Sequence, residues 1–488
     1  VGLPYLGTHT ELKTAHNLYL DVAIKVGVGP LVLLLLFCLW ALWFAGTCAS
    51  TMATEGPATL LCGMGWVLLS LWPPLLLVSV VGEDLVTDNL LLHWTMLFGV
   101  ALGLRGAIVG SAVPGRMVHL SATAGIGGGP VYITAVARHQ LQQGTQVRMV
   151  CSEEKPYVEM WREMGMRWTA LPMRHPNVRT IWNLVAVMLR DPAPVHAHGR
   201  GAAFFALWVK LLVRVPVIYT PHGPHYAFMR GWRFVSAWCV EYLFRVVFDT
   251  VLYVSHGEQV LAKSLRLPMR GARVVLSGMM SAPFRDGEQP VRREAIRQEV
   301  GVAPSQFVIG WIGRFHFQKG VDIFLASIPQ VVAHVPEAVW LVIGEGESEE
   351  IERYRDHMRQ LGLNAKVKFL GGRPDAHRVA AACDMYISTS RWEGLPLVLL
   401  EVMDRDVPIV ASDVVGNHDV LEGWGVLFPP NDSGAAARAQ IALAKNAEMR
   451  AALARRGRRV LHERFMLSRM LRELDCVYRD ACGEEVSV

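Results

Sequence analysis

The stretch STSRWEGLPLVLLE, residues 388–401, has the pattern of one strand–loop–helix unit of a parallel α/β sheet. The short apolar segment Met385–Ser388 leads into it and has the length of a buried strand. Pro396 suits the first position of a helix, where its missing N–H costs nothing. The amides of Leu397 and Val398 then have no acceptor within the helix. Because open parallel sheets bind ligands at the carboxyl ends of their strands, the stretch predicts a binding site there.

Outward from this stretch, short apolar segments alternate with helical segments along most of the chain. The predicted strands of a first series are Met117–Leu120, Gln146–Cys151, Pro194–His196, Val215–Tyr219 and Thr250–Val254. Those of a second series are Phe307–Ile312, Val339–Ile343, Val367–Leu370, Met385–Ser388, Ile409–Ala411 and Val426–Phe428. Such alternation is typical of parallel sheets joined by right-handed crossovers. We therefore predict an α/β fold with two doubly wound, Rossmann-like domains, linked by the polar stretch Asp286–Glu299.

Two glutamates, Glu393 and Glu401, are separated by seven residues in the quoted stretch. A helical rise of 1.5 Å per residue places them roughly 12 Å apart along the axis. Two carboxylates that act on one anomeric carbon lie about 5 to 9 Å apart, so these two do not form such a pair. They suit the two ends of a long ligand, with a sugar at Glu393, a diphosphate at the helix start and a ribose at Glu401. The alternative is a pair of solvated helix acids, although Glu401 sits in an apolar run.

Cations and glycines follow the first strand of each series. Gly313-Arg314 and Lys319-Gly320 come after Phe307–Ile312, and two cations at a strand's carboxyl end suit a diphosphate. Gly127, Gly128 and Gly129 precede a helix expected over Val131–Gln143, where bare backbone amides can approach an anion. For the two cations, the alternative is solvated surface charge. For the glycines, the alternative is a tight turn between strand and helix.

These motifs resemble those of the group 1 (family 4) retaining glycosyltransferases, which have the GT-B fold. The residues that carry the resemblance are Gly313-Arg314 with Lys319-Gly320, Gly344-Glu345-Gly346, Phe369-Leu370-Gly371, and Glu393 with Glu401. Val195-His196-Ala197-His198-Gly199 and Thr220-Pro221-His222-Gly223 also match strands of that family. The resemblance runs from Arg116 to the helix near Tyr478.

The resemblance implies a role for each matching residue. Arg314 and Lys319 would neutralise a departing nucleotide diphosphate, and Glu393 would bind the donor sugar. His222 would contact the sugar or its phosphate. The implied catalytic set is Glu393, His222, Arg314 and Lys319, and the substrate-binding set is Gly127, Gly128, Gly129, Gly394, Leu397, Val398 and Glu401. Front-face transfer with retention would need neither a metal ion nor a cofactor.

Three features depart from the family or compete with it. Ser277-Gly278-Met279-Met280 stands where the family has Asn-Gly-Ile/Val-Asp, so the family's usual polar contact is not carried over to this position. Asp404-Arg405-Asp406 mimics a D-x-D metal motif, but we interpret it as the turn that ends the Glu401 helix. Histidines 196, 198, 222 and 225 invite comparison with a zinc site, yet they belong to two separate strand ends, so we expect no metal.

The first 114 residues have the composition of a membrane region. Apolar stretches of bilayer length cover residues 22–46, 58–81 and 90–110. The alternative is a buried helical hairpin. His16-Asn17-Leu18-Tyr19-Leu20, before the first stretch, resembles the C-terminal end of the O-antigen ligase and polymerase family. Because the upstream helices of such a site are absent, we interpret His16 as a relic or half-site, placed on the outer side.

Composition agrees with a membrane-associated enzyme. The 488 residues have a mean hydropathy of +0.28, and 52% of them are hydrophobic. Residues 1–110 carry three Lys or Arg against six Asp or Glu, so the rest of the chain is basic. A basic body suits an anionic leaflet and phosphorylated substrates, or is only a solvated surface. Eight cysteines without a C-x-x-C pair argue against a disulfide framework and fit a reducing cytosol.

These observations give a domain plan: a membrane region over 1–114, an acceptor domain over 115–295, a nucleotide-sugar domain over 296–465, and a helix over 466–488 that crosses back to the first domain. We expect a multi-pass protein of the bacterial inner membrane with its transferase domains on the cytoplasmic face. Aromatic and basic residues mixed over Phe204–Phe248 belong mainly to core helices or form a membrane-facing acceptor surface.

The expected reaction moves a sugar from a nucleotide-sugar to a lipid-linked (polyprenyl-diphosphate) or polysaccharide acceptor, in O-antigen, capsule or exopolysaccharide assembly. We expect no nucleic-acid partner. The alternatives are a nucleotide-sugar epimerase of the same fold, a carbohydrate-binding scaffold, and a bifunctional fusion whose membrane part also ligates glycans.

Overall fold

The computed structural model describes residues 115–125, 127–280 and 293–482, all within one compact unit that spans Val109–Val488. The three predicted spans over residues 22–46, 58–81 and 90–110, and His16, lie outside the described residues. Along the described ranges, every helix is too short or too polar to cross a bilayer.

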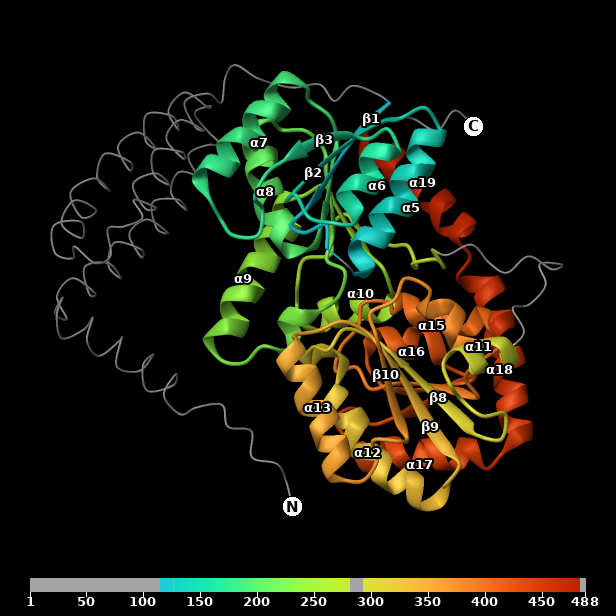
Figure 1. Cartoon of the computed structure of the whole chain (residues 1–488). Helices are drawn as coiled ribbons and strands as arrows, with labels where there is room; N and C mark the ends of the chain where they lie inside the picture. The colour runs from blue at the N-terminus through green and yellow to red at the C-terminus, as the bar shows by residue number, and fades with distance from the viewer. Residues whose placement is uncertain (1–114, 126, 281–292, 483–488) are drawn as a thin grey trace, which may run out of the picture. The chain divides into compact units, whose positions relative to one another are not determined.

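A first lobe is built on a seven-stranded parallel sheet in the order β3-β2-β1-β4-β5-β6-β7. Its strands are β1 (Arg116–Ser121), β2 (Gln146–Cys151), β3 (Arg167–Ala170), β4 (Val195–His198), β5 (Val217–Thr220), β6 (Thr250–Tyr253) and β7 (Ala272–Val274). Its helices are α5 (Gly128–Gln142), α6 (Tyr157–Glu163), α7 (Val178–Arg190), α8 (Gly199–Leu212), the 3-10 helix η3 (His225–Phe228), α9 (Trp232–Val247) and α10 (His256–Ser264). Figure 1 shows α5 and α6 on one side of the sheet and α7 and α8 on the other, as right-handed crossovers require.

A second lobe is built on a six-stranded parallel sheet in the order β10-β9-β8-β11-β12-β13. Its strands are β8 (Phe307–Ile312), β9 (Ala338–Ile343), β10 (Val367–Gly371), β11 (Met385–Ser388), β12 (Ile409–Ser412) and β13 (Val426–Phe428). Its helices are α11 (Arg293–Glu299), the 3-10 helix η4 (Phe317–Lys319), α12 (Val321–His334), α13 (Ser348–Gln360), α14 (Ala376–Ala380), α15 (Leu397–Asp404), α16 (Val415–Leu421), α17 (Ser433–Ala444) and α18 (Ala447–Arg464). The two doubly wound sheets predicted from the sequence are therefore present.

Every predicted strand is present, and two strands were missed. The missed strands, β3 and β7, are the two edges of the first sheet. Their residues are half-buried or exposed, so neither strand shows the continuous apolar run that marks a central parallel strand. The predicted linker over Asp286–Glu299 is also partly wrong, because Arg293–Glu299 forms α11 with Ile296 fully buried.

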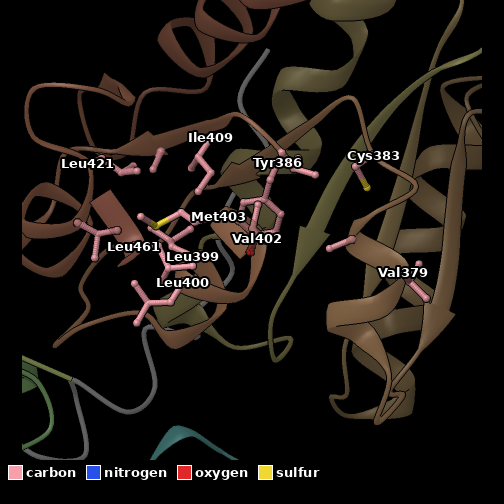
Figure 2. Close-up of a cluster of buried hydrophobic side chains, with 14 of the residues drawn as sticks. Val379, Cys383, Tyr386, Leu399, Leu400, Val402, Met403, Ile409, Leu421 and Leu461 are labelled. Atoms are coloured by element: carbon pink, nitrogen blue, oxygen red, sulfur yellow. The ribbon is translucent and has the colours of Figure 1, made fainter. Parts of the chain in front are cut away.

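The core of the second lobe fixes α15 firmly. Leu399, Leu400 and Met403 on this helix are buried in one cluster with Ile409 and Leu461 (Figure 2). Burying side chains of this size stabilises the helix position by about 1.5 to 3 kcal/mol each. The start of α15, at Leu397, is therefore held in place at the carboxyl edge of the sheet.

The last described helix, α19 (Leu467–Cys482), packs on the first lobe, although it follows the second lobe in the chain (Figure 1). Met470 and Leu474 are fully buried against Tyr132 and Val136 of α5. These α19 residues lie on one face because residues four apart on a helix are neighbours. The core of the first lobe therefore includes residues of α19.

Candidate active site

One cavity of about 790 Å³ is lined by residues of both lobes. Every sequence-predicted site residue of the described ranges lines it: Gly127, Gly128, Gly129, His222, Arg314, Lys319, Glu393, Gly394, Leu397, Val398 and Glu401. In each sheet the strand order reverses beside the first strand, at β1/β4 and at β8/β11. The lining loops follow β1, β8 and β11, so the cavity lies where doubly wound sheets bind their ligands.

Lys319 and Glu393 are paired within the cavity. The Lys319 Nζ donates to Glu393 Oε1 at 2.6 Å, and the Ser390 hydroxyl donates to the same oxygen at 2.7 Å. The Glu393 side chain is only 8% exposed. A lysine has three N–H donors, so Lys319 keeps two for a ligand while it orients the carboxylate.

Two arginines, Arg314 and Arg373, also line the cavity; Arg373 is paired with Glu299 and Asp375, whereas Arg314 is exposed. Among the described residues it has no carboxylate within ion-pair distance, so its charge is available to an anion. Its loop is fixed by two close backbone contacts. A Cβ added to Gly320, whose φ is +63°, would lie 2.1 Å from the Thr389 carbonyl oxygen. A Cβ added to Gly344 would lie 1.8 Å from the Gly313 carbonyl oxygen, so only glycine fits at either position.

The two lobes touch through the backbones of Gly223 and Gly394. A Cβ on Gly394 would lie 3.0 Å from the Gly223 nitrogen, and Gly223 has a φ of +125°. A Cβ on Gly128 would lie 3.7 Å from the Leu397 side chain. The Gly223–Gly394 contact is too close for larger residues, whereas Gly128 meets Leu397 at an ordinary packing distance; together these contacts place His222 of one lobe next to Glu393 of the other along the cavity wall.

Glu401 lies on α15, and Glu393 lies in the loop before it, because the helix begins at Leu397 with Pro396 as its N-cap. The expectation that Pro396 is the first helical residue is therefore off by one position, since its ψ of 102° is extended. The separation estimated from the helical rise per residue therefore does not apply, because the two glutamates do not lie on one helix. Burial raises the pKa of Glu401 to about 7, partly offset by the nearby Arg405.

His222 has a left-handed backbone, with a φ of +58°, and its Nε2 lies 3.1 Å from Nδ1 of His198. Burial lowers the pKa of His222 to about 4, so it is neutral at physiological pH. His198 and His222 do come from separate strand ends, as expected, but the two ends lie side by side. Their strands, β4 and β5, are hydrogen-bonded neighbours, which brings the two rings together.

His119 of β1 was missed by the sequence analysis. Its ring nitrogens and those of His196 and His198 lie within 4.8 Å of one another, the spacing of a metal site. The signal was its position in a strand adjacent to β4, where it pairs with His196 in register. Each ring already has hydrogen-bond partners on both nitrogens, so the donor atoms are engaged within the protein.

The Asp404-Arg405-Asp406 motif ends α15, as the sequence analysis predicted. Arg405 is the C-cap, and Asp406 adopts a φ of +54°. The Asp406 carboxylate accepts from Arg458 at 2.6 Å. None of the three residues lines the cavity. Ser277, which replaces the family's polar residue, does line it.

A second cavity of about 440 Å³ shares His222 and Gln318 with the first. Its walls are aromatic: Phe228 comes from η3, while Phe317 and Trp392 come from the second lobe. The Phe228 and Trp392 rings stack with centroids 5.3 Å apart. This cavity is not predicted by the sequence motifs, although Phe317 and Trp392 lie within two of the motif loops.

Two family models match the chain. The model described as glycosyl transferases group 1 matches residues 292–460, and the model described as glycosyltransferase family 4 matches residues 126–279. Between them these matches take in every strand of both sheets except β1, and the residues around the first cavity.

Individual proteins are similar to the chain at lower identity. The UDP-Gal:alpha-D-GlcNAc-diphosphoundecaprenol alpha-1,3-galactosyltransferase of Escherichia coli is 21% identical over 59% of this chain and 76% of its own length. The lipopolysaccharide core biosynthesis mannosyltransferase LpsB of Rhizobium meliloti is 26% identical over 42% of this chain and 60% of its own length. The structure of Anabaena Alr3699/HepE with UDP and glucose matches with a TM-score of 0.65 at 18% identity, over 75% of this chain and 99% of that one. That structural likeness shows the fold.

Proposed function

Because residues 126–279 and 292–460 belong to the group 1 (family 4) glycosyltransferases and fold as GT-B, we propose that this chain transfers a sugar with retention from a nucleotide-sugar to a lipid-linked or polysaccharide acceptor, in bacterial surface polysaccharide assembly. The observation that carries the proposal is the first cavity, which brings Arg314, Lys319, Glu393 and Glu401 together at the carboxyl ends of both sheets.

The charges in the cavity support one orientation of the donor. The diphosphate lies against Arg314, Lys319 and the free amides at the start of α15, where fixed positive charge is concentrated. The sugar then reaches Glu393, whose carboxylate is oriented by Lys319. The ribose hydroxyls reach Glu401 on the opposite side of the helix start.

Leaving-group stabilisation supplies the catalysis in this proposal. The bond from the anomeric carbon to the diphosphate oxygen breaks, and the charge that develops on the diphosphate is met by Arg314 and Lys319 without rearrangement. The acceptor hydroxyl attacks from the same face, and its proton passes to the departing diphosphate oxygen. Retention follows because bond breaking and bond formation occur on one face of the sugar. In this proposal the transfer uses neither a metal ion nor a cofactor.

The second cavity is the proposed site of the acceptor sugar. It meets the first cavity at His222, so a hydroxyl held there would lie beside the donor sugar. Its aromatic walls suit the apolar face of a sugar ring, and its lining residues contain no lysine, arginine or carboxylate. We place a neutral sugar there, with any acceptor diphosphate outside. The similar Escherichia coli enzyme is named for a diphosphoundecaprenol-linked acceptor, which supports a lipid-linked one.

The exposed face of α9 supports association with a bilayer. Trp232 is 69% exposed and Val235 is 56% exposed, and Leu243 and Val246 continue the same apolar surface. Arg233 adds positive charge beside Trp232, which suits anionic lipid headgroups. With the predicted spans of the first 114 residues, this surface supports a multi-pass inner-membrane protein whose transferase lobes lie on the cytoplasmic face.

The test is a transfer assay with the full chain in vesicles, radiolabelled UDP-, GDP- and ADP-sugars, and lipid-linked acceptor. Glu393→Gln and Lys319→Ala should each lower turnover by at least about a hundredfold, because they remove fixed groups from the reacting centre. Glu448→Gln, on the exposed start of α18, is the matched control and should keep full activity. NMR of the product decides retention.

Two outcomes would contradict the proposal. Normal turnover by Glu393→Gln and Lys319→Ala would remove these residues from the reaction. Conversion of the donor without any acceptor would indicate the epimerase alternative.

A further inference from the structure

Four side chains form a continuous hydrogen-bonded row from α5 to the first cavity. The Gln140 Oε1 lies 2.7 Å from Nε2 of His119, and His119 Nδ1 lies 2.9 Å from Nε2 of His198. The row ends at His222, whose Nε2 lies 3.1 Å from Nδ1 of His198. Gln140, His119 and His198 are each at most 5% exposed, so water does not compete for these bonds. The row therefore connects a buried amide to a residue of the cavity wall.

The row has a single direction, because a carboxamide oxygen can only accept. His119 must carry its proton on Nε2 to donate to Gln140, which leaves its Nδ1 as an acceptor. His198 must then donate from Nε2, which leaves its own Nδ1 as an acceptor. His222 must donate from Nε2 to His198. Since a neutral imidazole has one N–H, Nδ1 of His222 carries a lone pair.

The rings stay neutral in this environment. Burial lowers the pKa of His119 and of His222 to about 4, and the pKa of His198 lies well below its usual range for the same reason, with further lowering by the neighbouring histidines. A protonated His119 or His198 would carry an N–H on both ring nitrogens and would point one of them at the N–H of the next ring in this row. Neutrality and direction therefore support each other.

We propose that Gln140, His119 and His198 are positioning residues that hold His222 as its Nε2–H tautomer, so that its Nδ1 accepts a hydrogen bond from a hydroxyl of the sugar bound in the cavity. This inference rests on the proposed function for its ligand. The Nδ1 atom is the nitrogen of His222 left for a ligand, since Nε2 is turned to His198 and the residue lines both cavities. The row thus makes the enzyme select sugars with a hydroxyl at the matching position.

A metal ion at His119, His196 and His198 is the competing interpretation. Both nitrogens of His196 lie 2.8 Å from hydroxyls, one of Tyr478 and one of Thr220. An ion would need the lone pairs that these bonds and the row already use. The row and a metal site therefore exclude one another, and an experiment can separate them.

The direct test is ¹⁵N NMR of the full chain, labelled at histidine, in detergent. The His222 signals are identified by their loss in His222→Gln. We expect the shifts of an Nε2–H tautomer in the wild type, a mixture of tautomers in Gln140→Met, which removes the terminal acceptor, and a mixture in His198→Leu. His198→Asn, whose amide oxygen can replace Nδ1 as acceptor, should restore the Nε2–H form.

The kinetic test compares a parent donor with its monodeoxy analogues. The analogue that lacks the hydroxyl facing His222 is the one that loses most activity with the wild type. Gln140→Met should lower kcat/KM for the parent donor about fivefold, which corresponds to the loss of one neutral hydrogen bond. The kcat/KM for that analogue should stay unchanged. A purely structural role would lower both values equally.

Three results would overturn the inference: an Nδ1–H tautomer of His222 in the wild type, equal losses for parent and analogue in Gln140→Met, or one tightly held zinc ion per purified chain. The tautomer is read without turnover, so its outcome stands even where no transfer is found. Absence of transfer with the Nε2–H form present would count against the proposed function and leave the row in place.

Discussion

Among the residues that line the first cavity, Glu401 is the one whose charge state changes nearest to physiological pH; burial also raises the pKa of Glu258, outside that lining, to about 7. Burial raises the pKa of Glu401 to about 7, so the carboxyl is protonated at lower pH and ionised at higher pH. The ionised form is the stronger acceptor for ribose hydroxyls. His222, with a pKa of about 4, stays neutral over the same range. Because Glu401 lines the cavity and Glu258 does not, the pH dependence of donor binding near neutrality is assigned to Glu401.

We predict that KM for the donor falls about tenfold as the pH rises from about 6 to about 8, because the ionised fraction of Glu401 rises by that factor across its pKa. Glu401→Gln should bind donor more weakly and without this trend. Initial rates against donor concentration at several pH values provide the measurement. A flat profile in the wild type, or the same slope in Glu401→Gln, would assign the titration elsewhere.

At the residue scale, the sequence predicted which side chains line the site but not how the histidines meet. The candidates within the motifs follow strand ends in the chain, and strand ends share an edge of the sheet, so their common location was predictable. His119 sits inside β1 and belongs to no motif. Its contact with His198 depends on β1 and β4 being neighbours, which is a property of strand order rather than of local sequence.

At the element scale, the central strands were predictable and the edges were not. β9 is buried along its whole length, so all of its residues are apolar and the strand can be recognised in the sequence. β3 has exposed residues at both ends, Arg167 and Ala170, and half-buried residues between them, so its sequence resembles a loop. α11 lies in a polar, charge-rich stretch, and its contact with the second lobe through Ile296 cannot be read from composition.

The helix α19 gives a prediction at this scale. Leu474 is fully buried against the first lobe. Leu474→Ala should lower the free energy of unfolding by about 2 to 5 kcal/mol, because it removes buried methyl groups and leaves a cavity. Arg472→Ala, an exposed change on the same helix, is the control. Urea denaturation of the full chain in detergent measures both, and equal stability of the two variants would show that α19 does not support the lobe.

At the scale of the whole molecule, the apolar face of α9 links the lobes to a lipid-linked acceptor. Trp232→Asp combined with Val235→Asp should lower transfer to an acceptor held in anionic vesicles about tenfold, since two large apolar side chains no longer enter the interface. Transfer to a water-soluble acceptor should stay unchanged, because neither residue lines either cavity.

Met449→Asp, which changes an exposed apolar residue of α18, is the matched control for this surface. The comparison of the two acceptors in one preparation separates membrane docking from catalysis. Equal loss on both acceptors would mean that the α9 variant damages the fold, and no loss on vesicles would mean that the lipid contact lies elsewhere.

The return of α19 to the first lobe has a consequence for how the protein is made. Met117 of β1 shares a core with Met470 and Leu474 of α19. During translation β1 is synthesised long before α19, because the whole second lobe lies between them in the sequence. The core of the first lobe is therefore incomplete until α19 has been synthesised. A chain that stops before α19 therefore lacks part of the core of its first lobe.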